Sequence, residues 1–182
     1  VSNLNSGTAA GATTFWRGDA TWVTPTAGGI TAASQWRLTS SFTGDAAPIA
    51  SNLEEVDTYG GGVLGSSMTE SSGIFTFPST GIWHIFFAIN QLNTAASRYN
   101  GGELYVTLDD GTYNFVAQAY QNLYDDGSGV YSSGMLNYVL DVTSTSLVKV
   151  RFHSQVLIAG TTTDGNTSNN RTYMTFIRLG DT

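Results

Sequence analysis

The two histidines of this sequence are the first residues suited to acid–base or metal chemistry. His84 lies inside an apolar run and His153 follows Phe152. Neither has a second histidine or a glutamate at the spacing of a metal site, and no Gly-x-Ser-x-Gly turn offers a nucleophile. The sequence has no cysteine, which excludes thiolate ligands and a cysteine nucleophile. We therefore interpret both histidines as packed side chains and predict no catalytic residue.

Pairs of neighbouring carboxylates offer a second kind of chemistry, because calcium takes six to eight oxygen ligands and tolerates irregular loops. Asp109-Asp110 and Asp125-Asp126 are both candidates. Gly111 follows the first pair directly and favours a hairpin turn there. Calcium stays an alternative for the second pair, and apart from it we predict neither a metal nor another cofactor.

The acidic run 54–57 holds Glu54, Glu55 and Asp57, which are the kind of carboxylates that cleave glycosidic bonds. Neighbouring residues on a strand point to opposite faces, so these groups do not face each other across a bond. We interpret the run as a solvated strand edge.

Tyrosines around the second acidic pair are the best candidates for ligand contact. A tyrosine ring gives a large contact area at small entropy cost and stacks on sugar rings, while aspartate accepts hydrogen bonds from hydroxyls. Ordinary sandwich surface or a subunit interface is the alternative for the same residues. The ligand-binding candidates are Tyr120, Tyr124, Asp125, Asp126 and Tyr131.

Residues 1–32 are dominated by small and turn-forming residues, with aromatic residues at separated points. Such a segment cannot bury enough apolar area to offset its ordering entropy. We interpret it as a tether whose attachment candidates are Phe15, Trp16, Arg17 and Trp22. The integrin-type tripeptide at 17–19 is interpreted as a turn, clamped against the domain by Trp16 and Trp22.

The composition favours an all-β protein and excludes several partners. Glycine is abundant, proline is scarce, and no long segment has apolar residues at helical spacing. The net charge of -7, with Lys149 as the single lysine, argues against nucleic acid and anionic membranes, which gain no counterion release from an acidic surface. No apolar run approaches the roughly 18 to 20 residues that span a bilayer, and the start has no signal-peptide pattern.

Strands are predicted where apolar and polar residues alternate, in residues 35–43, 103–109, 146–154 and 172–179. The turn at 109–111 leads into a hairpin partner at 113–120. Residues 82–89 are apolar on both faces, which suits a strand covered by the opposing sheet on one side and by a neighbouring subunit on the other. The trimer-interface candidates are Trp83, Ile85, Phe87 and Tyr173.

Loops rich in Gly, Asp, Asn and Ser are expected at 59–67, 94–102, 125–129 and 160–170. Eight to ten strands in two sheets follow, as an antiparallel jelly-roll sandwich over residues 33–182.

The segment 73–89 resembles the signature of the complement globular-head and tumour-necrosis-factor-like superfamily. That signature is a short strand ending in Phe, then Pro, a Gly turn, and a strand with two spaced aromatic residues. The matching residues are Phe75, Pro78, Gly81, Trp83 and Phe86. The segment 173–179 is similar to the family's closing strand. The resemblance covers residues 35–180 and implies a ten-stranded jelly roll that assembles as a tight homotrimer.

Two motifs in the tether, LNSGT at 4–8 and TFWRGDATW at 14–22, are followed by Pro25. They resemble a linker that precedes the C-terminal knob of bacteriophage tail-fibre and other virion fibre proteins. This resemblance implies a trimeric protein on the virion surface whose tether joins a shaft or a shell.

We therefore expect a non-enzymatic phage protein, in the first place a trimeric fibre knob that contacts a host cell-surface glycan or protein. A trimeric capsid decoration protein is the alternative. A polysaccharide depolymerase is a further alternative, against which the lack of a convergent acid, base or nucleophile set weighs. The expected partners are further copies of the chain and other virion proteins, with no nucleic acid and no membrane insertion.

Overall fold

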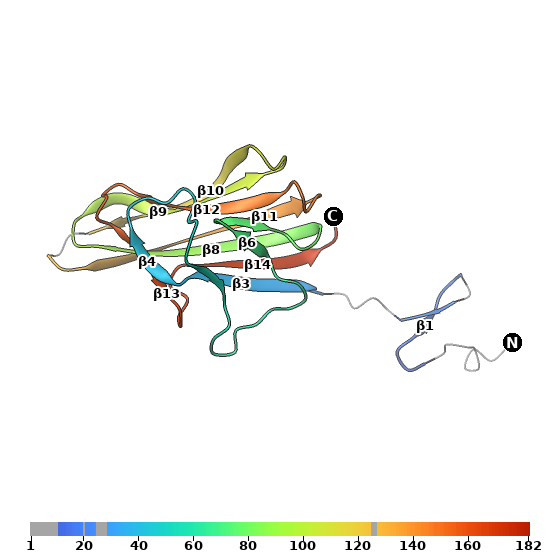
Figure 1. Cartoon of the computed structure of the whole chain (residues 1–182). Coiled ribbons are helices and arrows are strands. Elements are labelled where there is room, and N and C mark those ends of the chain that lie inside the picture. The colour runs from blue at the N-terminus through green and yellow to red at the C-terminus, as the bar shows by residue number, and fades with distance from the viewer. Residues whose placement is uncertain (1–10, 20, 25–28, 125–126) are drawn as a thin grey trace.

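The computed structural model describes residues 11–19, 21–24, 29–124 and 127–182, and every regular element within them is a β-strand (Figure 1). No helix in these ranges is long and apolar enough to cross a membrane. The strands are β1 (Phe15–Trp16), β2 (Trp22–Val23), β3 (Ala32–Leu38), β4 (Ser40–Thr43), β5 (Leu53–Glu55), β6 (Thr69–Ser71), β7 (Ile74–Thr76), β8 (Gly81–Asn93), β9 (Ser97–Thr107), β10 (Tyr113–Leu123), β11 (Val130–Val142), β12 (Lys149–Val156), β13 (Thr162–Asn166) and β14 (Tyr173–Gly180).

Strands β3 to β14 form two antiparallel sheets that pack face to face as a jelly-roll sandwich. The five-stranded sheet has the order β10-β9-β12-β7-β6. The seven-stranded sheet has the order β4-β13-β8-β14-β3-β5, and β11 pairs with β8 outside that path. Figure 1 shows β10 and β12 in the upper layer and β14 and β3 in the lower layer. The face of each sheet that is turned away from the other sheet is called its outward face below.

The core between the sheets is built around aromatic rings that the strand alternation points inward. The Phe75 ring lies 5.2 Å from Phe176 and 5.6 Å from Phe152, between ring centroids. The Phe152 ring lies 4.9 Å from Phe87. These rings come from β7, β14, β12 and β8, so the cluster joins both sheets, and tilted or edge-on ring contacts add to the energy of burying them.

The strands predicted at 103–109, 146–154 and 172–179 are confirmed as parts of β9, β12 and β14, and in each of them one alternate set is buried. Leu104, Val106, Val150, Phe152 and Phe176 are all buried. The pattern was wrong at Leu108, which lies beyond the end of β9 and is 61% exposed. The turn that follows it reverses the chain into β10 as predicted, since β9 and β10 pair antiparallel.

Several predicted boundaries were wrong. Residues 35–43 form two strands, β3 and β4, which pair with different neighbours. The loops predicted at 94–102 and 160–170 contain the start of β9 and the whole of β13, and the long strand β11 was not predicted. The two sheets hold five and seven strands where eight to ten in all were expected.

Buried polar residues explain why the start of β9 looked like a loop. Asn100 donates from Nδ2 to Gln91 Oε1 at 2.8 Å, and Gln91 donates from Nε2 to Ser154 Oγ at 2.9 Å. The space between the sheets is therefore polar at this end, and its strands lack the apolar alternation that a sequence pattern detects.

The predicted trimer-interface residues Trp83, Ile85 and Phe87 lie inside the protomer. Their exposures are 1%, 0% and 0%, because these alternate residues of β8 point at the five-stranded sheet. They form the core and are unavailable to a neighbouring subunit, so the prediction was wrong for them. Tyr173 lies on the outward face of the seven-stranded sheet, where its ring contacts Phe86 at 5.8 Å.

The described part of the tether forms a small hairpin of β1 and β2. The Trp16 and Trp22 rings pack edge-on with centroids 5.5 Å apart. This contact lies within the tether and is not the clamp onto the domain that the sequence predicted. The turn predicted at 17–19 is confirmed, because Asp19 Oδ1 accepts hydrogen bonds from the backbone N and Oγ1 of Thr21.

Replacing the central core ring by Phe75→Ala is expected to lower the free energy of unfolding by about 3–5 kcal/mol, because a cavity opens among the rings of Trp36, Phe152 and Phe176, which cannot close it. Urea unfolding at a fixed protein concentration measures the change. Leu108→Ala is the control and is expected to change stability by no more than about 0.5 kcal/mol. Equal losses in the two variants would contradict this description of the core.

Candidate binding surfaces

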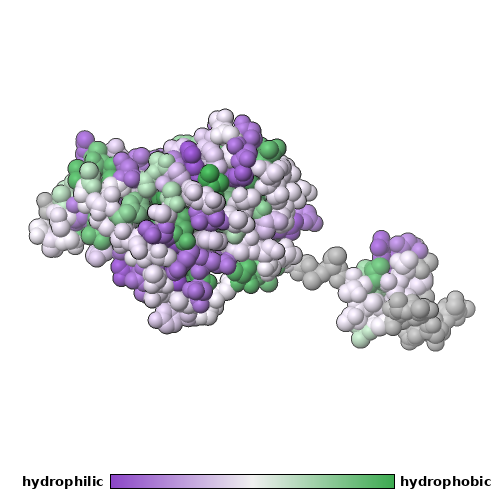
Figure 2. Space-filling view, viewed as in Figure 1, coloured by the Kyte–Doolittle hydropathy of each residue, from purple (hydrophilic) through white to green (hydrophobic). Residues whose placement is uncertain are grey.

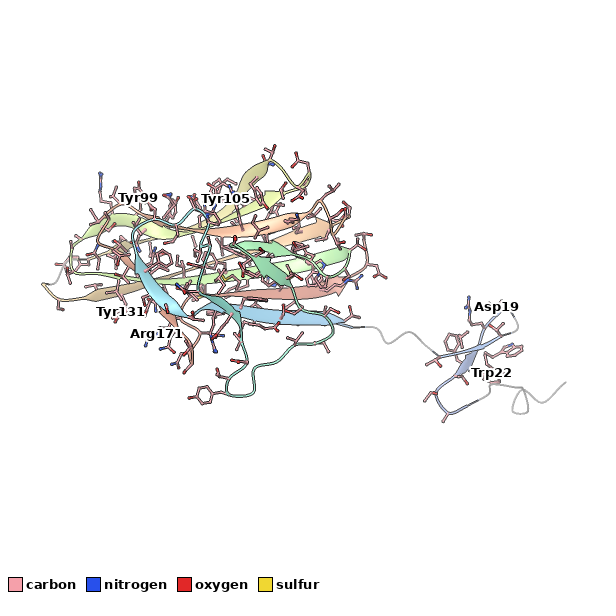
Figure 3. The ribbon with its side chains drawn as sticks, in the orientation of Figure 1. Asp19, Trp22, Tyr99, Tyr105, Tyr131 and Arg171 are labelled. Atoms are coloured by element: carbon pink, nitrogen blue, oxygen red, sulfur yellow. The ribbon has the colours of Figure 1, made fainter. Side chains whose placement is uncertain are left out.

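The predicted ligand-binding tyrosines do not form one cluster within a protomer. Tyr120 lies opposite Gly101 on the outward face of the five-stranded sheet, and Tyr131 lies opposite Leu92 on the outward face of the other sheet. In Figure 3, Tyr99 and Tyr105 mark the upper layer and Tyr131 the lower one. That part of the prediction was wrong, because consecutive strands β10 and β11 belong to different sheets. Asp125 and Asp126 lie outside the described residues, and Tyr124 is exposed just beyond β10.

The acidic pair at 109–110 forms a turn, as expected. Asp109 Oδ1 accepts hydrogen bonds from Thr107 Oγ1 at 2.8 Å and from the backbone N of Gly111 at 2.9 Å. These bonds hold the pKa of the Asp109 carboxyl below its usual range. Asp110 pairs with the Lys149 ammonium. In the described part of the chain, no three His, Asp or Glu side chains gather as a metal site would need.

The acidic run 54–57 balances a buried arginine. The Arg37 side chain is 1% exposed, and its Nε and Nη2 lie 2.7 Å from Glu54 Oε1 and 3.1 Å from Asp57 Oδ1. Arg37 also donates to Thr58 Oγ1 at 2.8 Å. A buried cation needs such partners. The strand edge expected here is confirmed, because β5 is the edge strand of its sheet, and the acidic run also neutralises the Arg37 charge. The Glu54 carboxylate is committed to Arg37.

The outward face of the seven-stranded sheet carries an extended set of apolar side chains, which we call the apolar face. Cross-strand pairing places Met135 beside Ala88, and Val139 beside His84. On the other side of β8, Ile177 lies beside His84. Met135 and Val139 are 65% and 56% exposed. The apolar face comprises Ile82, Phe86, Ala88, Leu92, Tyr131, Met135, Val139, Tyr173, Ile177 and Leu179.

His84 lies in the middle of this face and is half-buried. The expectation of a packed histidine was therefore only partly right, since one side of the ring faces out of the sandwich. Large exposed apolar areas on a folded domain mark surfaces that contact something else. The side of the domain seen in Figure 2 differs, because it mixes hydrophilic and apolar residues in small areas.

The outward face of the five-stranded sheet carries a different surface, which we call the tyrosine face. Its rings belong to Tyr99, Tyr105, Tyr113, Phe115 and Tyr120, and its polar members are Glu103, Gln118, Arg151 and His153. The Tyr99 and Tyr120 rings lie 5.6 Å apart, and the Tyr105 and Phe115 rings 5.5 Å apart.

Glu103 fixes two of these rings. Its Oε2 accepts a hydrogen bond from the Tyr105 hydroxyl at 3.1 Å, and its Oε1 accepts one from the Tyr120 hydroxyl. Burial, together with the bond to Glu103, raises the pKa of both tyrosine hydroxyls. The hydroxyls therefore remain protonated donors at neutral pH, and the carboxylate anchors both rings.

His153 is packed beneath this surface, as the sequence predicted. Its ring stacks on Tyr105 with centroids 4.1 Å apart, and its Nδ1 lies 3.9 Å from Glu103 Oε2. Burial, with the Arg151 charge nearby, lowers the pKa of His153 to about 4, and Glu103 opposes part of that shift. At neutral pH the imidazole is uncharged, so the contact with Glu103 is not an ion pair.

Arg151 completes the tyrosine face by covering rings with its guanidinium. The Arg151 Cζ lies 4.2 Å from the Tyr113 centroid and 5.4 Å from the Tyr105 centroid. Such cation–π contacts hold a charged side chain flat against a sheet. The sequence analysis did not select Tyr99, Glu103, Tyr105 or Arg151 as site residues. The signal available in the sequence was that Glu103 and Tyr105 share one side of the alternating strand predicted at 103–109.

The two sheets and their strand order define a TNF-like jelly roll. Among solved structures, the chain is similar to murine APRIL at pH 5.0, with a TM-score of 0.59, 11% identity, and coverage of 81% of this chain and 98% of that chain. It is also similar to Eiger TNF from S. frugiperda, with a TM-score of 0.56, 14% identity, and coverage of 85% and 95%. No family model matches the chain, and no curated protein matches it in sequence. The likeness at these identities shows the fold.

His153 is expected to make the protein less stable as the pH falls from about 6.5 to about 4. Its pKa is lower in the folded protein than in the unfolded chain, so the unfolded chain binds more protons in that window. The contribution of His153 to the free energy of unfolding changes by at most about 1.4 kcal/mol per pH unit, and it levels off below the pKa of the folded state. Urea unfolding between pH 4 and 8 of His153→Gln against the wild type isolates it, because the variant lacks this titration.

Gln118→Ala, on the same face but without a titrating group, is the control and should keep the wild-type slope. A His153→Gln profile parallel to the wild type throughout the window would show that the imidazole is not held neutral by the fold.

Proposed function

We propose that this chain is a non-enzymatic binding module that assembles as a homotrimer through the apolar face and is displayed on the surface of a phage particle. The observation that carries the proposal is the apolar face itself. Its aliphatic and aromatic side chains cover β11, β8 and β14 outside the core, with Met135 and Val139 more than half exposed. Burying such a surface against a partner is favourable at about 25 cal/mol per Å².

Charge favours a further copy of the chain as that partner. The chain carries a net charge of -7, so two copies repel each other unless their contact is poor in charge. Along β11, β8 and β14 the outward positions hold one carboxylate, that of Asp141, and it lies at the end of β11 opposite Ile82. A contact with apolar residues at its centre and few charges has the composition of homo-oligomer interfaces. The superfamily resemblance implies three copies.

A binding role is supported by the way the titratable groups are distributed. His153 lies on the outward face of one sheet and His84 on that of the other. Glu103 uses both carboxylate oxygens on tyrosine hydroxyls, and Glu54 and Asp57 pair with Arg37. Hydrolysis of a polysaccharide uses a pair of carboxyl groups on either side of the scissile bond, whereas the carboxylates named here are each bonded to a neighbouring side chain.

The virion location rests on the tether motifs at 4–8 and 14–22, which resemble phage fibre linkers. The hairpin of β1 and β2 supports an attachment role, since Phe15 and Trp16 are 48% and 42% exposed. Exposed aromatic rings on a short hairpin suit insertion into pockets of another protein, where such rings act as hot spots. A fibre knob is the function we propose first, and a capsid decoration protein is the alternative.

Trimerisation is expected to fail when a charge enters the apolar face. Met135→Glu and Val139→Glu each place a carboxylate where neighbouring copies meet, and desolvating it costs several kcal/mol. Sedimentation velocity at micromolar concentration should give three times the 19.3 kDa chain mass for the wild type and the chain mass for both variants. Leu108→Glu, at an equally exposed apolar position outside this face, should stay trimeric. A monomeric wild type would refute the trimer, and two trimeric variants would move the interface elsewhere.

Attachment to the particle is expected to depend on the tether rings. Trp16→Ala or Trp22→Ala should weaken incorporation by a few kcal/mol, as loss of an aromatic hot spot does. A chain starting at Ala32 should fold and trimerise without joining the particle. Both the tryptophan variants and the shortened chain are titrated onto particles that lack the protein, and gel densitometry measures their occupancy. Leu108→Ala is the control.

Full occupancy by the shortened chain would place the attachment surface on the jelly roll and favour the decoration-protein alternative. A shortened chain that fails to fold would make residues 1–31 part of the jelly roll.

A further inference from the structure

The two outward faces differ in the kind of partner that they suit. The apolar face contains aliphatic side chains such as Met135 and Val139. The outward positions of β9, β10 and β12 hold aromatic rings and polar groups, with no Leu, Ile, Val or Met among them. Aromatic rings surrounded by hydrogen-bonding groups match a ligand that has both C–H faces and hydroxyls, which is the chemistry of a sugar ring.

The rings of the tyrosine face are held in place before any ligand arrives. Tyr105 and Tyr120 both donate to Glu103, whose side chain is 9% exposed, and Tyr105 also stacks on His153. Tyr99 contacts the Tyr120 ring. A ring that is already ordered loses little entropy on binding, so weak contacts with several sugar units suffice for measurable affinity.

The face has the length of a short oligosaccharide. Two residues of β10 mark its ends: Tyr120 lies opposite Gly101 of β9, and Phe115 lies opposite Tyr105 of β9. Gly101 and Tyr105 are four residues apart on β9, which is about 13 Å at a rise of about 3.3 Å per residue. Tyr99, Phe115 and Tyr120 are each more than two-fifths exposed, so rings are accessible at both ends of that distance.

Unpartnered polar atoms beneath the rings are a second and independent observation. His153 Nε2, Arg151 Nε and Tyr113 Oη are buried and have no hydrogen-bond partner in the described part of the protein. The His153 side chain is 7% exposed. Buried polar atoms nearly always have a partner in the protein or in ordered water. Because these atoms have almost no accessible surface, ordered water is the partner that suits them, and a ligand on the face reaches them through such water.

Charge restricts the class of sugar. The Glu103 carboxylate lies at the centre of the face, and the Arg151 guanidinium is committed to the Tyr113 and Tyr105 rings. The chain as a whole is acidic. At the described outward positions of β9, β10 and β12 the other cation is Lys149, which is paired with Asp110. An anionic sugar would therefore meet the carboxylate without an unpaired cation at these positions, whereas a neutral sugar avoids this repulsion.

We propose that the tyrosine face binds a neutral oligosaccharide of three or more sugar units, stacked along Tyr99, Tyr120 and Phe115. This inference rests on the proposed binding function and names the class of its ligand. The site belongs to a single protomer, on the side of the sandwich opposite the apolar face, so it does not require the trimer.

The test uses the full chain on a printed array of neutral hexose oligosaccharides, neutral N-acetylhexosamine oligosaccharides and sialylated oligosaccharides, followed by titration calorimetry with the best neutral probe. The wild type should bind neutral probes of three or more units and ignore the sialylated ones. Tyr99→Ala and Tyr120→Ala should each weaken binding at least about tenfold, as loss of a stacking ring does. Tyr120→Phe, which keeps the ring but loses the bond to Glu103, should weaken it less.

Tyr59→Ala is the matched control, because Tyr59 is an exposed tyrosine in a loop outside the tyrosine face. It should bind like the wild type, and circular dichroism should show that every variant is folded. No binding to any neutral probe, or binding that survives both Tyr99→Ala and Tyr120→Ala, would overturn the proposal.

Sedimentation velocity of the same samples shows whether a failure concerns the sugar ligand or the proposed trimer. A monomeric wild type that binds neutral sugars would refute the trimer alone. A trimer that binds only sialylated probes would leave the assembly standing and refute the ligand class.

Discussion

Strand β8 is the element on which the two-sheet arrangement depends. It pairs with β11 along its whole length, with β14 along most of it and with β13 at its far end. Because its side chains alternate strictly, placing Trp83, Ile85 and Phe87 in the core also turns His84 and Phe86 outward. A slip by one residue would exchange the two sets and expose the core rings, so the pairing register is strongly specified. The apolar face follows directly from this alternation, since β8 is apolar on both sides.

A charged side chain that is nearly inaccessible to water organises part of each outward face. Arg37 belongs to β3 and is balanced by Glu54 and Asp57 from the segment that runs beside it. Glu103 belongs to β9 and accepts from two tyrosine hydroxyls, with no cation in hydrogen-bond contact. The two cases have different consequences. Arg37 holds the edge segment of its sheet in place through ion pairs, whereas Glu103 orders a surface of rings that remain accessible.

Alternation in the sequence located several strands and separated their two faces, because burial of every second side chain is a local property of a strand. Phe152 and Phe176 each belong to one of the two alternate sets of their strand, and both are buried. For β8 the same reasoning failed, since both sets of alternate residues are apolar and the pattern does not tell which set faces the other sheet. That is why Trp83, Ile85 and Phe87 were predicted at the interface and are found in the core.

The tyrosine face was beyond sequence reasoning for a related reason. Tyr105 and Tyr120 meet at Glu103 only because β9 and β10 pair in one particular register, which shifts at a bulge between Phe115 and Ala117. His153 reaches the same place from β12, far along the chain. A sequence pattern places such residues on a face, but the cross-strand neighbour depends on the register and on bulges, which propensities do not encode.

The opposite placement of the two faces connects the proposed assembly to the proposed binding. When three copies meet through their apolar faces, the tyrosine face of each copy stays on the far side of its own sandwich and remains accessible. Three sites then lie on one particle, and a ligand displayed repeatedly on a surface meets all of them. Linked sites raise the overall affinity by about 10²–10⁴ over a single site when the geometry allows simultaneous contact. In the proposed trimer, a shallow, open face of rings would therefore suffice for firm attachment to a glycan-covered surface, even with weak binding at each single site.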